Sequence, residues 1–536
     1  MTSTQQSGSP HTELPPSPVP TLPPGHLASR IFGIETEYGF HIDGRDPGDL
    51  IREATACVNA YPRVWAGHWD YRREDPRADA RGFRVAHLTP NPEDAKWEKS
   101  GEPQMPLDQV RADHVLANGA RLYNDHGHPE YSTPECSTLR ELVAHDKAGE
   151  RIVLECARLY AQRAGGSFAI YKNNTDYHGI SYGCHEDYLV RRDVPFERLI
   201  QVLTPFLVTR QIYAGAGKVG IEQDGSAFSG LVYQLSQRAD YVTELASVET
   251  LYRRPIINTR DEPHADPRLY RRFHVIVGDA NMSEYATALR VGATALVLAL
   301  AEDGWLPDLR LRNPVEAIKA ISRDPSQRWV VELEDGRKTT ALDIQYIYLD
   351  AARRTLAGLG PDADWTLAEW AATLEALGRD PLDLADRLDW VAKRLLLETY
   401  QREEGVTWED PVMLALDLEY HNVDPERGLY YGLEQAGQVR RIVTEAEIQA
   451  AMQHPPVSTR AFVRGLCVER FHQAIRLVGW SRISLERDGH TATMDLSRLV
   501  DGEVAGLNQR LAGASDLDEF LHILREGRKR LRSAIQ

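Results

Sequence analysis

Residues 30–42 combine a strand pattern with a pair of carboxylates, and this combination limits most strongly what the chain can form. From Phe32 to Phe40 a bulky or β-branched side chain occupies every second position, with glycine or glutamate between them. This alternation predicts a β-strand, and it places Glu35 and Glu37 together on the face opposite the bulky residues. Two neighbouring carboxylates repel each other, and a divalent cation such as Mg²⁺ would offset that repulsion. An exposed acidic face on an edge strand is the alternative interpretation.

The segment 121–136 concentrates titratable side chains. If residues 121–125 form a strand, Arg121, Tyr123 and Asp125 point to the same side. Four titratable residues then fall within one short turn: Asp125, His126, His128 and Glu130. A glycine and a proline between these residues break any helix, so an HxxxH metal-binding helix is not expected. The prolines and aromatic residues of the segment indicate a fixed backbone and favour a functional cluster. A solvated charged loop is the alternative.

Two later segments carry further candidate ligands. His185 lies between Gly183 and two acidic residues, which suits a metal ligand, although a lone histidine is more often an ordinary hydrogen-bonded residue. Arg272 and His274 share one strand face. Because arginine binds phosphate oxygens through paired donors, this pair suits a phosphate beside a metal ion. An ion-paired sheet surface is the alternative.

Residues 215–220 match the pattern GxGxxG, but they do not predict a dinucleotide site. Such a site requires a strand before the glycines and a helix after them. Here residues 199–213 have a helical pattern, and the residues after the motif are strand-like or turn-like. The motif also lacks the glycine spacing and the Ser/Thr of a P-loop.

The composition excludes several classes of protein. The chain has 536 residues, with 62 Lys+Arg against 79 Asp+Glu and a formal net charge of −17. Sequence-independent nucleic-acid binding needs clustered positive charge, so nucleic acid is not expected as a partner. No apolar run reaches the ~18 residues of a membrane span, and residues 1–29 lack the basic and apolar parts of a signal peptide. Five scattered cysteines without a CxxC pair argue against disulfides and structural zinc. We therefore expect a reduced, cytoplasmic protein with no membrane partner.

Changes of pattern along the chain predict its organisation. Residues 1–29 are rich in Pro, Ser and Thr and are expected to be disordered. Residues 68–114 hold five prolines and dense mixed charge, which indicates a long structureless loop insert. Helical spacing is found at 141–162, 196–213, 286–301, 341–359, 365–377, 381–401 and 457–478, with a charged helix from 516. Strand patterns are found at 168–171, 254–259, 273–277, 328–333, 483–485 and 492–496. The mixture predicts an α+β fold with a substantial antiparallel sheet and a small C-terminal α/β domain.

Five motifs together make the chain similar to a known family. They are GIETEYG at 33–39, NGARLYNDHGHPEY at 118–131, KNN at 172–174, SYGCH at 181–185 and NTRDEPHAD at 258–266. These motifs resemble the Pup ligase/deamidase family, which is related to glutamine synthetases and γ-glutamyl-cysteine ligases. The resemblance implies a glutamine-synthetase-like antiparallel sheet with helices on one face. It assigns the catalytic domain to residues 30–455 and a small C-terminal domain to residues 456–536.

The resemblance also implies roles for single residues. Asp125 resembles the catalytic aspartate of the family. Six residues resemble or adjoin the Mg²⁺-binding positions: Glu35, Glu37, Tyr123, Glu130, His185 and His274. Five residues resemble nucleotide contacts: Gly33, Arg121, Thr133, Arg272 and Trp480. Arg238 and Arg260 resemble arginines near the phosphates and the end of Pup.

Within the family, the chain resembles the Pup deamidases, which also act as depupylases, more than the Pup ligases. The DHGHPE pattern at 125–130 and the insert at 68–114 favour this branch. The resemblance implies hydrolysis of the side-chain amide at the C-terminal residue of Pup, so that Gln becomes Glu or the isopeptide bond to a lysine is cut. ATP, bound without stoichiometric turnover, and Mg²⁺ are the implied cofactors, and Pup and pupylated proteins are the implied partners. Asp125 would be the nucleophile or the general base, and the choice between Asp125 and a nucleotide-derived phosphate as the attacking group stays open.

Three other functions stay open at this point. A Pup ligase would have the same fold and would consume ATP to form the isopeptide bond. A non-catalytic Pup- or nucleotide-binding regulator and a small-molecule γ-glutamyl ligase are more distant alternatives. Because Pup is itself acidic, a chain with a net charge of −17 needs a local basic groove to bind it. The candidates for this groove are Arg210, Lys218, Arg238, Arg253 and Arg254.

Overall fold

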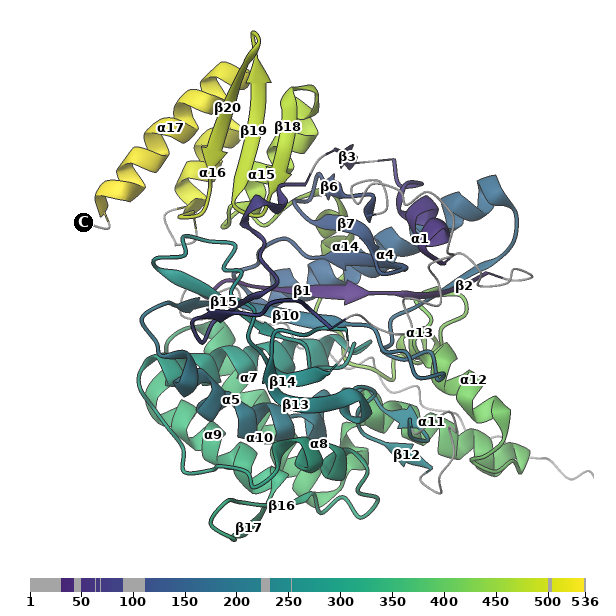
Figure 1. The fold of residues 1–536 in the computed structure, drawn as a ribbon. Coiled ribbons are helices and arrows are strands. Elements are labelled where there is room, and N and C mark those ends of the chain that lie inside the picture. The colour runs from purple at the N-terminus through teal and green to yellow at the C-terminus, as the bar shows by residue number, and fades with distance from the viewer. Residues whose placement is uncertain are drawn as a thin grey trace, which may run out of the picture.

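Seven antiparallel strands form the central sheet of the structure (Figure 1). The computed structural model describes residues 30–534 except 43–49, 63, 68, 90–110, 223–231, 252 and 500–503. The tail predicted at 1–29 and the middle of the predicted insert, at 90–110, lie outside the described residues. From edge to edge the strands of the sheet are β15 (Tyr270–Val275), β10 (Cys184–Arg191), β1 (Phe32–Glu37), β8 (His128–Ser132), β7 (Arg121–Asp125), β6 (His114–Leu116) and β3 (Val64–Ala66).

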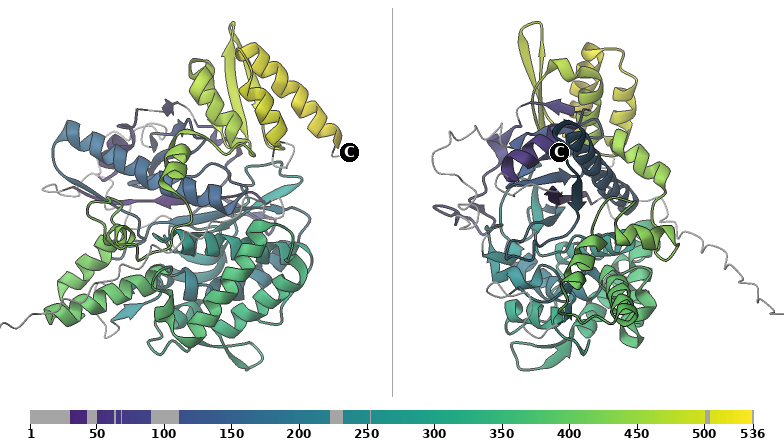
Figure 2. Two further views of the ribbon diagram at one scale, coloured as in Figure 1. Left: turned by 180° about the vertical axis from the view of Figure 1, so that it is seen from behind. Right: turned by 90° about the vertical axis from the view of Figure 1, so that its right-hand side faces the viewer.

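One face of this sheet is apolar and is covered by helices, and the other face is polar. On β1, Phe32 and Ile34 are buried in the main hydrophobic core, whereas Glu35 and Glu37 point to the opposite face. The covering helices are α4 (Leu139–Ala164), α5 (Phe196–Thr209) and α7 (Glu284–Glu302), with α9 (Ala341–Leu356) and α10 (Pro361–Arg379) packed behind them. Seen from behind, the blue helix α4 crosses in front of the strands, and the teal and green helices lie below them (Figure 2). The predicted antiparallel sheet with helices on one face is confirmed.

Local sequence signals set the ends of the covering helices. The Thr138 side chain accepts a hydrogen bond from the backbone N–H of Glu141 and caps the first turn of α4. At the other end of α4, Gly165 adopts a positive φ of 72°, which glycine tolerates without strain. α7 has the length and apolar composition of a membrane span, but 94% of its apolar window is buried inside the protein. The apolar composition of α7 therefore matches its place in the centre of the core.

The remaining elements surround this core. The other helices of the large unit are α1 (Leu50–Val58), α6 (Gln211–Ala214), α8 (Pro314–Ser322), α11 (Asp389–Glu404), α12 (Pro411–Tyr420), α13 (Leu429–Gln435) and α14 (Glu445–Gln453), with 3₁₀ turns η2 (Ala239–Tyr241) and η3 (Pro381–Leu384). Short strand pairs are β2 (Gly39–Ile42) with β9 (Phe168–Tyr171), β11 (Lys218–Val219) with β12 (Tyr233–Gln234), β13 (Val242–Ser247) with β14 (Arg254–Asn258), and β16 (Val330–Glu332) with β17 (Lys338–Thr340). The GxGxxG motif follows helix α6 and itself contains strand β11, whereas a dinucleotide site needs a strand before the glycines and a helix after them.

The C-terminal residues form a smaller unit with a core of its own. It consists of α15 (Ala461–Phe471), η4 (His472–Ala474), β18 (Ile475–Gly479), β19 (Arg482–Arg487), β20 (His490–Asp495), α16 (Val504–Ala512) and α17 (Leu517–Ala534). The helix predicted over 457–478 is wrong at its end, from residue 475, because Ile475 and Val478 pair with β19 and pack into this C-terminal core. Trp69 and Val115 from the N-terminal part also enter the C-terminal core.

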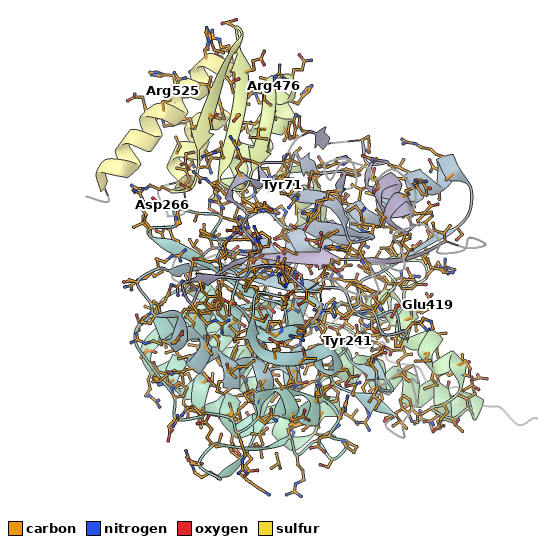
Figure 3. All side chains as sticks on the ribbon, viewed as in Figure 1. Tyr71, Tyr241, Asp266, Glu419, Arg476 and Arg525 are labelled. Atoms are coloured by element: carbon orange, nitrogen blue, oxygen red, sulfur yellow. The ribbon has the colours of Figure 1, made fainter. Side chains whose placement is uncertain are left out.

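The first part of the insert is ordered, so the prediction of a structureless loop is wrong for residues 69–89. The segment contains η1 (Tyr71–Arg73) and a small hairpin of β4 (Ala78–Asp79) and β5 (Phe83–Arg84). The N–H of Asp70 donates to the carbonyl of Val478 at 2.7 Å, and the N–H of Ala80 donates to the carbonyl of Thr259 at 2.8 Å. These bonds pair backbone N–H groups of a segment in which the sequence pattern predicts no strand. The segment therefore extends from the C-terminal unit across the polar side of the sheet, and Figure 3 labels Tyr71 at its upper end.

Candidate active site

Antiparallel pairing brings the acidic and imidazole side chains of four strands into one row. Glu35 pairs with His185 across β1 and β10, and Glu37 pairs with Glu130 across β1 and β8. His274 on β15 lies opposite Asp187, two residues beyond His185. Side chains at alternate positions share a face, so this row lies on the polar face of the sheet. It lines a cavity of about 510 Å³, a size typical of small-molecule sites.

The first group that can hold a metal ion consists of Glu35, His185 and His274. Ligand atoms of these three residues lie within 4.8 Å of one another. Burial lowers the pKa of His274 well below its usual value, and the charge of Arg272 lowers it further. The imidazole of His274 is therefore neutral. Its Nδ1 lies 2.7 Å from Oδ1 of Asp187. If Nδ1 donates this hydrogen bond, Nε2 carries the lone pair that a cation needs.

The backbone also supports this first group. A side chain at position 183 would collide with the ring of His185, since an added Cβ would lie 2.3 Å from its Nε2. The N–H of Gly183 donates to the Glu37 carboxylate at 2.7 Å. The glycine therefore orients a carboxylate and leaves room for an imidazole at the same time.

The second group consists of Glu37, Asp125 and Glu130, again with oxygen atoms within 4.8 Å of one another. Glu130 is 1% exposed. Burial, followed by the charges of Asp125, Glu35 and Glu37, raises the pKa of Glu130 well above its usual value. This concentration of carboxylate oxygens fits Mg²⁺, which prefers oxygen ligands and would offset the repulsion among them.

Tyr123 supports Glu130 from the neighbouring strand. Its hydroxyl donates to Oε1 of Glu130 at 2.7 Å. Burial and the charge of Glu130 raise the pKa of Tyr123 well above its usual value, so this hydroxyl stays protonated. Tyr123 is thus a neutral hydrogen-bond donor within the second group, and its assignment as a direct metal ligand stays a prediction.

Asp125 stands at the end of β7, where the strand turns into β8. Burial alone would raise its pKa, but the positive charges of His126 and Arg111 outweigh burial and lower the pKa below its usual value. An Nη2 atom of Arg111 lies 3.9 Å from Oδ1 of Asp125, and Nε2 of His126 lies 4.0 Å from the same oxygen. Asp125 is therefore an ionised carboxylate that faces the cavity beside Arg111 and His126.

A narrow slot opens beside the cavity and contains four of the five predicted nucleotide contacts. It is lined by Gly33, Thr133, Arg272 and Trp480, among others. The Thr133 hydroxyl accepts the N–H of Ile34 at 3.0 Å, and a Cβ at Gly33 would lie 3.1 Å from that hydroxyl oxygen. The slot shares Arg272 and Trp480 with the cavity, so the two spaces adjoin each other.

Arg121, the fifth predicted nucleotide contact, has a different environment. Its guanidinium forms a 2.5 Å ion pair with Asp113 and lies 4.2 Å from the ring of Trp69 and 3.8 Å from that of Tyr123. It lines the cavity but not the slot. Buried protein groups therefore already satisfy much of the hydrogen-bonding capacity of Arg121.

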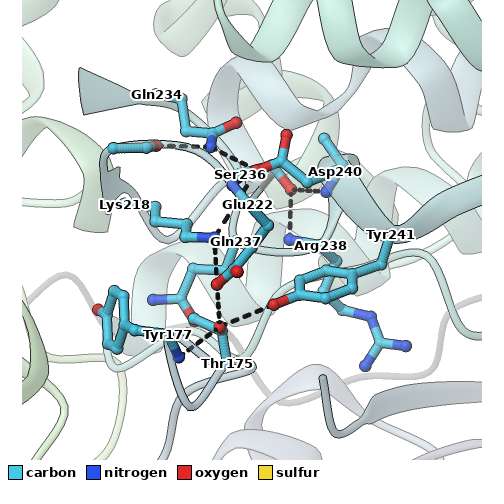
Figure 4. A network of polar contacts seen from close by, with 12 residues as sticks. Thr175, Tyr177, Lys218, Glu222, Gln234, Ser236, Gln237, Arg238, Asp240 and Tyr241 are labelled. Carbon is cyan, nitrogen blue, oxygen red and sulfur yellow. Dashed lines mark hydrogen bonds and ion pairs between the residues drawn. The ribbon is translucent and has the colours of Figure 1, made fainter. Parts of the chain in front are cut away.

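The predicted basic groove is partly wrong. Arg210 is buried in an ion pair with Glu186 on the apolar side of the sheet. Lys218 is buried against Glu222, in a network that also contains Asp240 (Figure 4). Arg210 and Lys218 are therefore both buried and paired with carboxylates, because a buried charge needs a partner of opposite sign.

The other predicted arginines have different surroundings. Arg238 and Arg260 line the cavity and donate to the carbonyls of Tyr182 and Val248, and Figure 4 shows the guanidinium of Arg238 pointing away from the Lys218 network. Arg254 also lines the cavity, whereas Arg253 is exposed, with an atom 4.0 Å from Glu244.

The sequence patterns missed several residues of the cavity wall. Tyr71, Glu74, Pro76, Leu88 and Arg111 come from the insert. Their chemistry did not distinguish them from other charged loop residues. The unusual length of the insert, which favours a functional loop, was the signal that pointed to them.

Comparison with known proteins decides the family. A family model described as "Pup-ligase protein" matches residues 30–484. The chain belongs to the Pup-ligase family. This result agrees with the resemblance seen in the motifs of β1, β7 and β10.

Two curated members of the Pup-ligase family are similar over nearly their whole length. A protein named depupylase, from Acidothermus cellulolyticus, is 44% identical over 505 residues, which cover 91% of this chain and 98% of the relative. A Pup deamidase/depupylase from Mycolicibacterium smegmatis is 44% identical over 507 residues, which cover 92% of this chain and 99% of the relative.

Two solved structures of the family have the same fold. The complex of the prokaryotic ubiquitin-like protein Pup with its ligase PafA matches with a TM-score of 0.72 and 33% identity, covering 94% of this chain and 95% of the ligase. PafA in complex with ADP matches with a TM-score of 0.67 and 34% identity, covering 81% of this chain and 96% of PafA. These matches confirm the predicted α+β fold and the predicted family.

Proposed function

We propose that the chain hydrolyses the side-chain amide at the C-terminal residue of Pup, so that it deamidates a terminal Gln and cleaves the isopeptide bond of pupylated proteins. The names of the two similar curated relatives support this hydrolase prediction over the ligase alternative. They also support Pup and pupylated proteins as its partners. The experimental question is which of the two chemistries the site performs.

One observation carries the catalytic assignment: Asp125 is an ionised carboxylate that faces the cavity beside Arg111 and His126. An amide carbonyl that enters the cavity would meet Asp125 as nucleophile or as general base toward water. Arg238 and Arg260 line the same cavity and would stabilise the negative charge that develops on the carbonyl oxygen.

The cofactors extend this proposal. The PafA–ADP complex supports nucleotide binding, and we assign the base and ribose to the slot lined by Gly33, Thr133 and Trp480. Two groups would hold Mg²⁺, the first with Glu35, His185 and His274 and the second with Glu37 and Glu130. When bound, Mg²⁺ would neutralise phosphate and carboxylate charge in the cavity. The residues of the chain orient the nucleotide and keep Asp125 ionised.

Location and domain limits are part of the same proposal. Five cysteines are buried and free, which suits a reducing compartment, and we place the protein in the cytoplasm. We assign residues 30–455 to the catalytic domain and residues 456–536 to the C-terminal domain. The separate C-terminal core supports this division, although Trp69 contributes to that core from the insert.

Incubation of the purified chain with ATP, Mg²⁺ and Pup ending in Gln tests the function directly. Release of ammonia and cleavage of a Pup–lysine conjugate support the hydrolase. Attachment of Glu-ended Pup to protein, without ammonia release, would establish the ligase instead. Binding of Pup and ATP without either product would indicate a regulator, and turnover of free glutamate with amines would indicate a small-molecule ligase.

A further inference from the structure

A buried aspartate on the loop between β15 and α7 holds the segment that carries Arg238. Asp279 is 2% exposed and is not among the described residues that line the cavity. Its Oδ2 accepts the N–H of Ala216 at 2.8 Å and that of Gln237 at 3.0 Å. Its Oδ1 accepts the Ser236 hydroxyl at 2.9 Å and the N–H of Arg238 at 3.1 Å. One carboxylate therefore satisfies three backbone N–H groups and a hydroxyl.

This segment has no regular secondary structure to pair its backbone. Residues 235–238 follow strand β12 and precede the 3₁₀ turn η2. Buried backbone N–H groups need partners, which a helix or a sheet supplies in most cases. For residues 237 and 238 the Asp279 carboxylate is that partner, so their conformation depends on a side chain from a distant part of the chain. The Ser236 hydroxyl adds a second tie, because it accepts the N–H groups of Arg238 and Ala239, both at 3.1 Å.

The GxGxxG motif at 215–220 packs against the same segment. The N–H of Gly217 donates to the carbonyl of Leu235 at 2.8 Å, and Nε2 of Gln237 donates to the carbonyl of Gly217 at 3.1 Å. A Cβ at position 215 would lie 2.3 Å from the carbonyl oxygen of Leu235. Gly217 also adopts a positive φ of 74°, which glycine tolerates. The glycines therefore let the two backbones approach closely, which explains the motif without a nucleotide.

The segment held in this way presents a guanidinium to the cavity. Arg238 is 2% exposed and lines the cavity, and its Nη1 donates to the carbonyl of Tyr182 at 2.5 Å. No described residue accepts a hydrogen bond from its Nε or Nη2, and Figure 4 shows the guanidinium directed away from Lys218. Both ends of the Arg238 residue are therefore fixed, the backbone by Asp279 and the guanidinium by Tyr182, while N–H donors remain for a ligand.

We propose that Asp279 is a positioning residue that sets the direction in which Arg238 faces the cavity. This inference rests on the hydrolase function proposed above, in which Arg238 stabilises the negative charge that develops on the amide oxygen. Donors of this kind depend on their placement, and a misplacement of ~1 Å can cost ~10²-fold in rate. Because Asp279 does not line the cavity, it acts through Arg238.

A double-mutant cycle with Arg238 tests the proposal. Asp279→Asn keeps the size of the side chain, but its NH₂ group would face two of the four donors. We expect it to lower kcat on Gln-ended Pup at least about tenfold, with KM changed less than about threefold, because the weakened interaction forms in the transition state. In the Arg238→Met background, the same substitution should lower kcat by less than about threefold more, since the group that it positions is gone.

Two further variants separate positioning from loss of folding. Ser236→Ala removes a hydroxyl from the same network, should show the same pattern, and decides the question if Asp279→Asn does not fold. Asp324→Asn is the matched control, because Asp324 also accepts three backbone N–H groups and a serine hydroxyl. These donors belong to Ser326, Arg328 and Trp329, none of which lines the cavity. The control should change kcat by less than about threefold in either background.

Three results would overturn the proposal. The first is a loss in Asp279→Asn that is equally large with and without Arg238, because it would show a general loss of folded enzyme. The second is an unchanged kcat in Asp279→Asn or in Arg238→Met. The third is a crystal structure of Asp279→Asn in which residues 236–238 have not moved, since we expect a shift of ~1 Å or more. This third result does not require activity. Failure of the unmodified chain to release ammonia would instead refute the hydrolase function itself.

Discussion

Arg111 lies 3.9 Å from Asp125, although Arg111 belongs to the insert and Asp125 to strand β7. Asp125 ends a strand of the central sheet, and Arg111 lies near the end of the insert. The contact shows that the insert contributes charge to the site and is more than a surface loop. It also explains, together with His126, why the pKa of a buried aspartate is lowered when burial alone would raise it.

Substitution Arg111→Met tests this contact. Removal of the positive charge is expected to raise the pKa of Asp125, so the acidic limb of the kcat/KM profile should move to higher pH. Asp125 stays ionised at pH 7 in the variant, so we expect less than about a threefold loss there, and a shift of the acidic limb by about 0.7 pH units, since a partly exposed charge pair is worth about 1 kcal/mol. Arg111→Lys keeps the charge and should keep the profile. An unchanged acidic limb in Arg111→Met would contradict the assigned role.

Substitution Asp125→Asn tests the catalytic assignment. We expect cleavage of Gln-ended Pup to fall by at least ~10³-fold, because the variant has neither nucleophile nor base. Binding of ATP should persist, since the slot at Gly33 and Trp480 does not include Asp125. Ammonia release and nucleotide titration measure the two effects. Undiminished turnover would remove Asp125 from the mechanism.

Substitution Glu130→Gln tests the metal proposal. The pKa of Glu130 is raised in the folded protein, so its ionised form opposes folding when no cation is present. We expect a higher Tm for the variant than for the unmodified chain in EDTA, and a smaller gain in Tm on addition of Mg²⁺. The Mg²⁺ concentration for half-maximal activity should rise by about 10-fold or more.

Ser132→Ala is the matched control for Glu130→Gln. The Ser132 hydroxyl donates to the same Oε1 at 3.2 Å but carries no charge. This variant should keep the Mg²⁺ response of the unmodified chain. Equal responses to Mg²⁺ in all three proteins would speak against a cation at Glu130.

Glu135 predicts a pH dependence of stability. It accepts hydrogen bonds from Arg460 at 2.7 Å and Arg464 at 2.5 Å, which join β8 to the C-terminal unit. Burial would raise its pKa, but these arginines lower it from 4.5 to about 2. The folded pKa lies below the unfolded one, so the stabilisation is complete above about pH 4.5 and is lost as the pH falls toward about 2.

Substitution Glu135→Gln measures this contribution. It leaves two buried arginines without a counter-charge, and we expect the free energy of unfolding to fall by about 3–5 kcal/mol at pH 7. The difference from the unmodified chain should shrink as the pH is lowered from 4.5 to 2.5. Urea unfolding at pH 7 and pH 3 provides the comparison, and a difference independent of pH would refute the ion-pair explanation.

The alternation of side chains along single strands was enough to predict much of the fold and of the site. The two-residue period on β1, β7 and β15 placed Glu35 with Glu37, Arg121 with Tyr123, and Arg272 with His274, because neighbours at i and i+2 share a strand face in any sheet. The helical prediction failed at 475–478, where the chain pairs with β19, because a short apolar run is compatible with either a helix or a strand.

Local sequence patterns could not predict the contacts between distant segments. Nothing in the residues around Arg210 or Lys218 distinguishes a buried ion pair from a substrate-binding surface. The partners that come from other segments, Glu186 for Arg210 and Asp240 for Lys218, became known only with the fold.

The sequence by itself determined the strand faces and the family, and it indicated Asp125 and the acidic and imidazole residues as site candidates, because these depend on spacing and on residue type. Only the tertiary structure decided that Arg111 lies beside Asp125, that the insert lines the cavity, and that Trp480 reaches the slot from the C-terminal unit. The reason is physical: side chains at alternate positions take their direction from the backbone, whereas contacts between distant segments depend on how the whole core packs.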